Sequence, residues 1–220
     1  FEDPKNKFLK EVKRIVKNKK SLLIFDEIVT GFRFGLGGAQ KYFDVEPDIS
    51  CFGKSMGNGM PIAAITGKRN IMKNLEEIFF SGTFGGETLS LSASLAVIDK
   101  MERLPVVEHL WNYGKKLKTE VNKLIKSFKL GDTIKIEGKS PWAFVNFNDT
   151  SSYNKFQIIT FFKKMMIKHG VLVTGTHNIC YAHNKHDLKI ILHAYKETLS
   201  LLSQSIKKKN LEQFIKDCSL

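Results

Sequence analysis

The sequence has 220 residues, 42% of them apolar, which is enough to bury a core in one or two domains, and no apolar run approaches the roughly 20 residues of a membrane-spanning helix. Its three cysteines, Cys51, Cys180 and Cys218, are odd in number and widely scattered, so they offer no metal-binding spacing and fit a reducing cytosol. The formal net charge of +13 comes mainly from lysines spread along predicted helices, and only four of the 35 basic residues are arginines. This composition favours a solvated surface over specific nucleic-acid binding. Weak, nonspecific anion binding is the alternative.

Helix and strand patterns alternate through the first hundred residues. Apolar residues recur at helical spacing over 4–18 and predict an amphipathic helix. The run 22–25 has no polar alternation, which predicts a strand covered on both faces, as in a parallel sheet. The glycine-rich segment 27–47 is long enough to be a functional loop. Further strands are predicted at 49–52 and 62–66, and further helices at about 69–78 and 87–102.

The pattern changes after Leu104 and Pro105, and we place a domain boundary near residue 104. A lysine-rich amphipathic helix is predicted to extend from there to about residue 128. Helices and strands in this order indicate an α+β domain. The later predicted elements are strands at 134–137, 142–147 and 171–173, and helices at about 153–169 and from 185 onward.

Two features of the first hundred residues are candidates for chemistry. One apolar run ends abruptly in a pair of acids that begins with Asp26, and Lys54 lies on a turn among glycines. The Gly-Lys-Ser sequence from Gly53 resembles the end of a nucleotide-binding phosphate loop. Such a loop needs a glycine five residues before Gly53, and this chain has Asp48 there, whose negative charge opposes a polyanion. The acid-tipped strand also precedes the lysine, which reverses the usual order and argues against a P-loop NTPase.

A Schiff-base site fits these residues better. A lysine that attacks a carbonyl must be held still and partly deprotonated, and glycines around it let the backbone approach a planar cofactor. A carboxylate at a strand end can keep the pyridine nitrogen of pyridoxal 5'-phosphate protonated, so that the ring accepts electrons. Thr83, in a glycine-rich turn before a predicted helix, offers a hydroxyl and backbone amides to a phosphate. Lys54, Asp26 and Thr83 together supply what such a site requires.

The same stretch resembles the class III pyridoxal-phosphate-dependent aminotransferases. The resemblance is dense over residues 20–100, and within the family it looks most like the glutamate-1-semialdehyde 2,1-aminomutase branch. It implies a fold-type-I α/β transferase, with 1–104 as the C-terminal portion of the mixed-sheet, cofactor-binding large domain and 105–220 as the small α+β domain. The matching segments are Phe-Asp-Glu-Ile-Val-Thr-Gly-Phe-Arg from Phe25, Gly-Ala-Gln from Gly38, Pro-Asp-Ile from Pro47, Gly-Lys from Gly53 and Gly-Asn-Gly-Met-Pro from Gly57.

The resemblance also implies a role for each site residue. Asp26 would pair with the pyridine nitrogen, and Ile28 would lie against a face of the ring. Lys54 would form the Schiff base and, once displaced by substrate, move a proton between the substrate carbon and the cofactor. Thr83 would reach the phosphate of the cofactor in a neighbouring subunit, which implies a homodimer with an intersubunit site. For Glu27 a structural and a functional role remain open.

Two departures from the family pattern qualify these expectations. The family's N-terminal half, with its phosphate-binding turn, is absent, so the chain looks like the C-terminal half of a longer protein, and we expect the 220 residues alone to retain the cofactor poorly. The segment 174–183 has histidines and an asparagine where the aminomutases usually have a glutamate. This difference favours a mutase-like aminotransferase with another substrate, and it leaves open whether His177 and His183 contact substrate or are ordinary loop residues.

The rival hypothesis is a noncatalytic protein, a truncated or degenerate family member that serves as a binding or assembly module. The presence of Asp26, Lys54 and Thr83 argues against such decay. The sequence therefore predicts an enzyme that transfers amino groups with pyridoxal 5'-phosphate, acts on small molecules in the cytoplasm, and contacts neither membrane nor specific nucleic acid.

Overall fold

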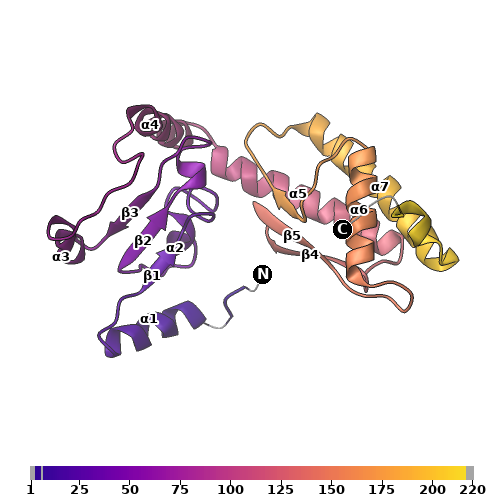
Figure 1. The fold of residues 1–220 in the computed structure, drawn as a ribbon, viewed down its shortest axis with the longest axis horizontal. Helices are drawn as coiled ribbons and strands as arrows, with labels where there is room; N and C mark the ends of the chain where they lie inside the picture. Colours follow the sequence, from indigo (N-terminus) through magenta and orange to yellow (C-terminus); the bar gives the residue numbers. More distant parts are fainter. Residues whose placement is uncertain (1–2, 6, 217–220) are drawn as a thin grey trace. The chain divides into compact units, whose positions relative to one another are not determined.

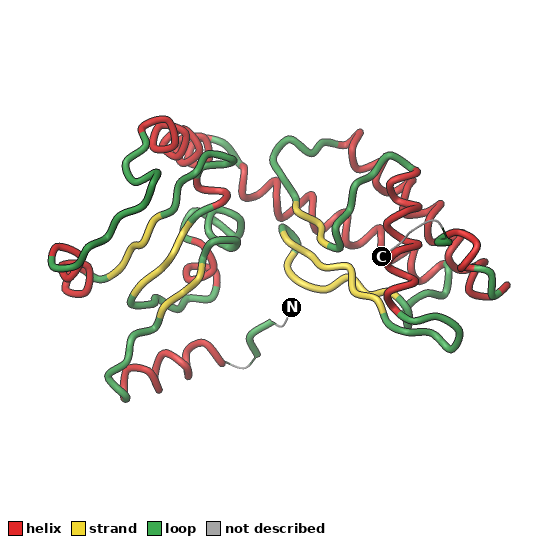
Figure 2. The backbone as a smooth tube through the Cα atoms, viewed as in Figure 1, coloured by secondary structure: helices red, strands yellow, loops and turns green. Residues whose placement is uncertain are grey.

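The computed structural model describes residues 3–5 and 7–216, which form two compact units that divide between His109 and Leu110 (Figure 1). The division falls inside a helix, a few residues after residue 104, near which the sequence predicts a domain boundary. Each unit has its own three-stranded sheet flanked by helices, as the tube in Figure 2 shows. No helix of the described ranges is both long and apolar enough to cross a membrane.

The N-terminal unit is built on a mixed sheet in the order β1-β2-β3. Strands β1 and β2 are parallel, with Asp26 opposite Cys51, whereas β2 and β3 are antiparallel. The elements are α1 (Phe8–Asn18), β1 (Ile24–Asp26), α2 (Gly38–Tyr42), β2 (Ile49–Phe52), η1 (Lys54–Met56), β3 (Ala64–Gly67), α3 (Arg69–Met72), η2 (Lys73–Glu76) and α4 (Thr88–Arg103).

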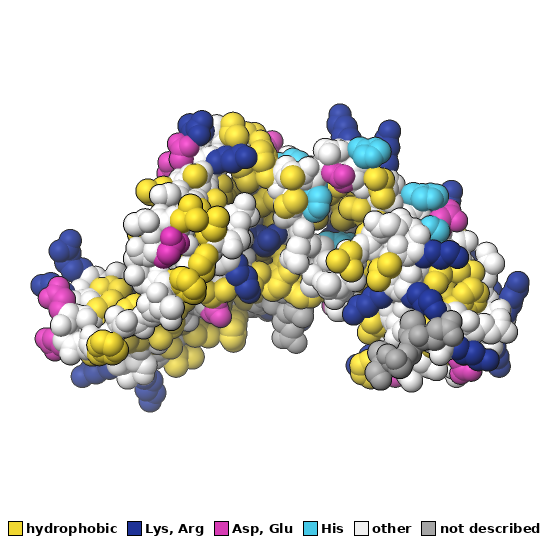
Figure 3. Space-filling view, turned by 45° about the horizontal axis from the view of Figure 1, so that its top comes forward, with side chains coloured by type: hydrophobic (Ala, Val, Ile, Leu, Met, Phe, Trp, Pro, Cys, Tyr) yellow, Lys and Arg dark blue, Asp and Glu magenta, His cyan; other side chains and the backbone are white. Residues whose placement is uncertain are grey.

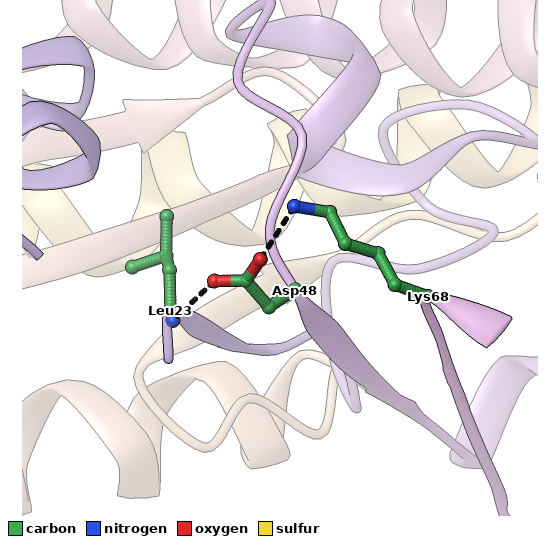
Figure 4. Close-up of polar contacts among 3 residues, drawn as sticks. All are labelled: Leu23, Asp48 and Lys68. Carbon is green, nitrogen blue, oxygen red and sulfur yellow. Dashed lines mark hydrogen bonds and ion pairs between the residues drawn. The ribbon is translucent and has the colours of Figure 1, made fainter. Parts of the chain in front are cut away.

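Asp48 links the starts of β1 and β2 to the residue that follows the end of β3. One carboxylate oxygen accepts a hydrogen bond from the backbone N–H of Leu23 at 2.8 Å, and the other contacts the ammonium of Lys68 at 2.6 Å (Figure 4). The hydrogen bond from Leu23, and after it Lys68, holds the pKa of Asp48 below its ordinary value. The residue that argues against a nucleotide site in the sequence is therefore a structural bridge in the fold.

The faces of the N-terminal sheet are more open than the sequence predicts. Ile24 of β1 is 56% exposed, so the expectation that this strand is covered on both faces is wrong for this chain. The reason is that few apolar side chains of the unit lie over the sheet, whereas many point outward, among them Phe79, Phe80 and Leu95. A parallel strand needs helices on both faces, and this unit does not supply enough of them.

The C-terminal unit packs helices against an antiparallel sheet in the order β4-β5-β6. The sequence places a strand at 171–173, and this is wrong: the third strand is β6, because its residues pair with Trp142 to Phe144 of β5. Helix α6 begins with a capping box formed by Asn154 and Gln157, and Asn184 starts α7 in the same way. The elements are α5 (Val106–Ser127), β4 (Ile134–Lys139), β5 (Trp142–Phe147), α6 (Lys155–Lys168), β6 (Thr176–Asn178), α7 (Lys185–Lys208) and η3 (Leu211–Phe214).

This unit has a continuous apolar core. Ile136 of β4 and Val145 of β5 lie opposite each other and are both buried, so one face of the sheet is covered. Helix α5 approaches the β4–β5 hairpin so closely that a Cβ on Gly114 would lie 1.9 Å from the carbonyl oxygen of Ser140. Only glycine fits at that contact. The other core residues include Leu117, Val121, Ile158, Phe161, Phe162, Met166, Tyr195, Leu199 and Leu202.

Candidate active site

Asp26 is the last residue of β1 and is exposed at the carboxyl end of the strand. Its Oδ1 accepts a hydrogen bond from the backbone N–H of Ile28 at 2.9 Å, which fixes the direction of the carboxylate. The second oxygen has no hydrogen-bond partner among the described residues. A fixed carboxylate with one free oxygen, placed where a parallel strand ends, is suited to accept a hydrogen bond from a cationic ring nitrogen.

Lys54 lies three residues beyond Cys51, the β2 residue paired with Asp26. Because β1 and β2 are parallel, their carboxyl ends meet at the same edge of the sheet, and both residues are at that edge. Lys54 is exposed and has a φ of 42°, a left-handed conformation that is rare outside glycine. Its carbonyl accepts hydrogen bonds from Gly57 at 3.2 Å and Asn58 at 3.0 Å, which closes a tight turn.

The glycines of this turn leave space that side chains would fill. A Cβ on Gly53 would lie 3.1 Å from Cδ1 of Ile28, and a Cβ on Gly57 would lie 2.4 Å from Cγ2 of Ile62. The Ile28 side chain therefore lies next to the backbone that carries Lys54. Together with Asp26, this arrangement places a carboxylate, an aliphatic side chain and an amine along one sheet edge, which fits a flat aromatic ring bearing a carbonyl.

Glu27 is fully buried and anchors the loop that follows β1. Its carboxylate accepts hydrogen bonds from the backbone N–H groups of Ala39 and Gln40, both at 2.8 Å, and from the hydroxyl of Thr30 at 2.5 Å. A Cβ on Gly38, which has a φ of 66°, would lie 2.6 Å from this carboxylate. These contacts assign a structural role to Glu27, a question that the sequence leaves open.

Thr83 lies on an exposed turn between η2 and α4. The turn is closed by a hydrogen bond from the N–H of Gly85 to the carbonyl of Gly82 at 2.9 Å, and the Thr83 hydroxyl has no partner within the described ranges. Glu87 caps the following helix, since its carboxylate accepts from the N–H groups of Leu89 and Ser90 at 2.7 Å each. Thr83 is thus presented outward ahead of a capped helix.

Histidines of the segment 174–183 take part in the packing of the C-terminal unit. The His177 ring is 7% exposed and its Nε2 lies 2.6 Å from the hydroxyl of Tyr195. Burial lowers the pKa of His177 to about 4, so the ring is neutral at physiological pH. His183 accepts a hydrogen bond from the N–H of Cys180 at 3.2 Å and stacks on Tyr113. Both histidines have intramolecular partners that explain them as structural residues.

The fold is that of the pyridoxal-phosphate-dependent transferases of fold type I, which confirms the predicted fold class. A solved structure of the FumI protein of Sphingopyxis sp. MTA144, in its PLP internal aldimine form, matches with a TM-score of 0.82 and 24% identity, over 91% of this chain and 48% of that one. The sequence model of the family described as aminotransferase class-III matches residues 1–206. The chain belongs to the class III aminotransferase family.

Two curated relatives show how far the similarity reaches. The chain is 36% identical to the 3-aminobutyryl-CoA aminotransferase of Cloacimonas acidaminovorans over 90% of its own length and 48% of that protein. It is 33% identical to the glutamate-1-semialdehyde 2,1-aminomutase of Methanococcoides burtonii over 87% of its length and 48% of that protein. The chain therefore spans about half the length of these relatives.

Proposed function

We propose that this chain contributes the catalytic half of a pyridoxal-phosphate-dependent amino-transfer site. The observation that carries the proposal is the position of Asp26 and Lys54 at the carboxyl ends of two adjacent parallel strands, in a chain of the class III aminotransferase family. Pyridoxal 5'-phosphate, when bound, supplies an electron sink that allows an amino group to leave one carbon skeleton and join another.

Three residues of the N-terminal unit would hold the cofactor and move the proton. Lys54 would attach to the cofactor through its amine and, when substrate displaces it, carry a proton away from the substrate carbon and return it one position along. Asp26, oriented by the Ile28 N–H, would keep the proton on the pyridine nitrogen through its free oxygen. The Ile28 side chain, adjacent to Gly53, would cover one face of the ring and exclude water from it.

The exposed turn of Thr83 supports the further proposal of a homodimer with an intersubunit site. The hydroxyl of Thr83 and the amides of its turn would bind the cofactor phosphate of a second subunit. Exposed apolar side chains border the turn, which supports burial of this region in an assembly. The apolar neighbours are Ile78 at 56% exposure, Phe79 at 97%, Phe80 at 67% and Phe84 at 59%.

We place the activity among amino-group transfers on small molecules rather than on one named substrate. The two curated relatives are an aminotransferase and an aminomutase, and both reactions need the same lysine and carboxylate. His177 is buried and bonded to Tyr195, so this histidine does not replace the aminomutase glutamate. This favours a mutase-like aminotransferase, acting in the cytoplasm in line with the scattered cysteines.

Covalent trapping tests the proposal without knowledge of the substrate. The longest available form of the protein is incubated with pyridoxal 5'-phosphate, reduced with borohydride, digested and analysed by mass spectrometry. The expected result is an adduct on the peptide that contains Lys54, lost in Lys54→Ala and kept in Lys73→Ala, a lysine of η2 outside the site. Equal labelling of surface lysines with none at Lys54, in a protein that stays colourless with the cofactor, would favour the noncatalytic module.

A further inference from the structure

The edge of the C-terminal sheet next to helix α5 has a feature that amino transfer does not use. Strand β4 is the outer strand of its sheet, so one side of its backbone has no neighbouring strand among the described residues. A groove of about 590 Å³ runs along this side, between the second half of α5 and β4. Residues on its walls include Asn122, Lys126, Lys129 and Lys135.

The direction of the β4 backbone groups can be fixed from its hydrogen bonds. The carbonyl of Thr133 accepts from the N–H of Asn148 at 2.9 Å, so residue 133 faces β5, and alternation along the strand turns 134, 136 and 138 outward. Lys118 confirms this alternation, because its ammonium reaches the outward carbonyl of Gly138 at 2.8 Å. The outward N–H of Ile134 is already bonded to the carbonyl of Leu130 at 2.8 Å.

The rest of the outer edge of β4 has backbone groups that are free to pair with another strand. The N–H and C=O of Ile136 and the N–H of Gly138 point away from the sheet and have no hydrogen-bond partner among the described residues, whereas Ile134 is covered. Donors and acceptors alternate along this edge as they do along any strand. An extended peptide satisfies such a row with its own backbone, which is how edge strands recruit short segments of other proteins. A nucleic-acid backbone supplies phosphate acceptors to the N–H groups but no donors for the outward carbonyls.

The charges around the edge define the side chains of the partner. Lys126, Lys129 and Lys135 line the groove and have no ion-pair partner in the described part of the chain. Of the two acids in the lining, Glu137 is hydrogen-bonded to Asn146 at 2.5 Å, and Asp132 follows Gly131 at one end. The wider surface has the same sign: residues 110–220 contain 19 lysines and eight acids, a net charge of +11, and basic side chains lie across the face drawn in Figure 3.

The need to keep the edge of β4 from pairing with other sheets does not by itself explain the lysines around the groove. A lysine on an edge strand, such as Lys135, keeps sheets from pairing with one another. Lys126 and Lys129 are not on the strand: one lies on α5 and the other just after it, on the opposite wall of the groove. A cationic wall facing an open strand edge draws in an anionic strand.

We propose that the groove between α5 and β4 binds an extended acidic peptide segment of a partner protein, which pairs with the outward edge of β4. Ile134 and Ile136 on the floor are 1% and 7% exposed, so they offer little apolar area. Affinity therefore depends on backbone pairing and charge, and binding is reversible and weakens with salt.

The probe is a synthetic peptide of alternating glutamate and valine, titrated against the full chain by fluorescence anisotropy. Saturable binding with one site is expected. Lys126→Gln and Lys129→Gln should each weaken it about two- to fivefold, the effect of one partly exposed charge pair. Lys116→Gln, on the same helix but outside the groove, should leave it unchanged. A peptide of the same charge with alternate N-methylated amides should bind on the order of tenfold more weakly, because it cannot pair with the edge.

Amide hydrogen exchange locates the contact. On peptide binding the amides of Ile136 and Gly138 should become protected, while those of Lys135 and Glu137, which already face β5, should not change. Equal binding of the N-methylated peptide, or binding without protection at Ile136, would overturn the proposal in favour of charge alone. Protection at Ile136 that grows with protein concentration before peptide is added would overturn it in favour of a second copy. Protection by a DNA oligonucleotide but not by the peptide would assign the groove to nucleic acid.

Discussion

The buried carboxylate of Glu27 gives a sharp test of how the loop next to the candidate site is held. In Glu27→Gln, the amide oxygen can accept from only one of the two backbone N–H groups at 2.8 Å, and the new NH₂ faces the other donor. Loss of one hydrogen bond to a charged acceptor costs about 1.5–3 kcal/mol. In Glu27→Ala both N–H groups and the Thr30 hydroxyl lose their acceptor and a cavity forms, so the cost rises to about 3–5 kcal/mol.

Hydrogen exchange at Ala39 and Gln40 measures this effect at its source. A local loss of about 2 kcal/mol speeds exchange of these amides roughly 30-fold. Glu46→Gln, a change of the same chemistry at an exposed position, should leave both rates within a few-fold of the wild type. Urea denaturation followed by circular dichroism should show the same order, with Glu27→Ala least stable. Wild-type exchange rates at Ala39 and Gln40 in Glu27→Gln would refute the anchoring role of the carboxylate.

Three further predictions concern single contacts. Gly114→Ala forces α5 away from the hairpin and should destabilise the C-terminal unit by about 3 kcal/mol or more, whereas Gly131→Ala, with no atom within 4 Å of the added carbon, should change stability by less than about 1 kcal/mol in thermal melts. His177 binds a proton less readily in the folded protein than in the unfolded chain. As pH falls from the ordinary pKa of 6.5 to the folded value of about 4, the free energy of unfolding should therefore drop by roughly 3 kcal/mol. In pH-dependent denaturation, His177→Gln should flatten this slope. Asp48→Asn should lower the free energy of unfolding by about 1 kcal/mol at pH 7, because the contact with Lys68 is partly exposed. The difference in stability from the wild type should vanish as pH falls below 3.8 and through the lowered pKa of Asp48. A difference that stays unchanged at acid pH would contradict the bridging role of Asp48.

The sequence predicts elements well where the signal is local. Strand β2 matches the predicted range, α4 to α6 match within a few residues and α7 starts where predicted, because helical periodicity and end signals are read within one segment. The predicted continuation of the last helix is wrong, since α7 ends at Lys208 and η3 follows as a separate short helix. The third strand of the C-terminal sheet is wrong because valines at 171 and 173 favour a strand. Pairing with Trp142 to Phe144 is instead made by Thr176 to Asn178. Register set by a distant partner leaves no mark in the segment itself.

The residues of the candidate site are likewise predictable from the sequence only where the signal is local. Asp26 and Lys54 are visible in the sequence, because an apolar run that ends in acids and a lysine among glycines are both local patterns. The anchoring role of Glu27 is not, because its backbone partners lie 12 and 13 residues further along the chain and amides carry no residue identity. The pairing of His177 with Tyr195 is hidden for the same reason, since 18 residues separate them.

The backbone at Lys54 has a consequence for the chain as a whole. A residue with a side chain pays about 1–2 kcal/mol to adopt a left-handed conformation, and glycine does not. Lys54→Gly would therefore relax the turn and stabilise the fold while removing the amine, whereas Lys54→Ala keeps the penalty and isolates the chemistry. The turn would be more stable without its lysine, which means that folding alone gives no reason for a lysine to occupy position 54.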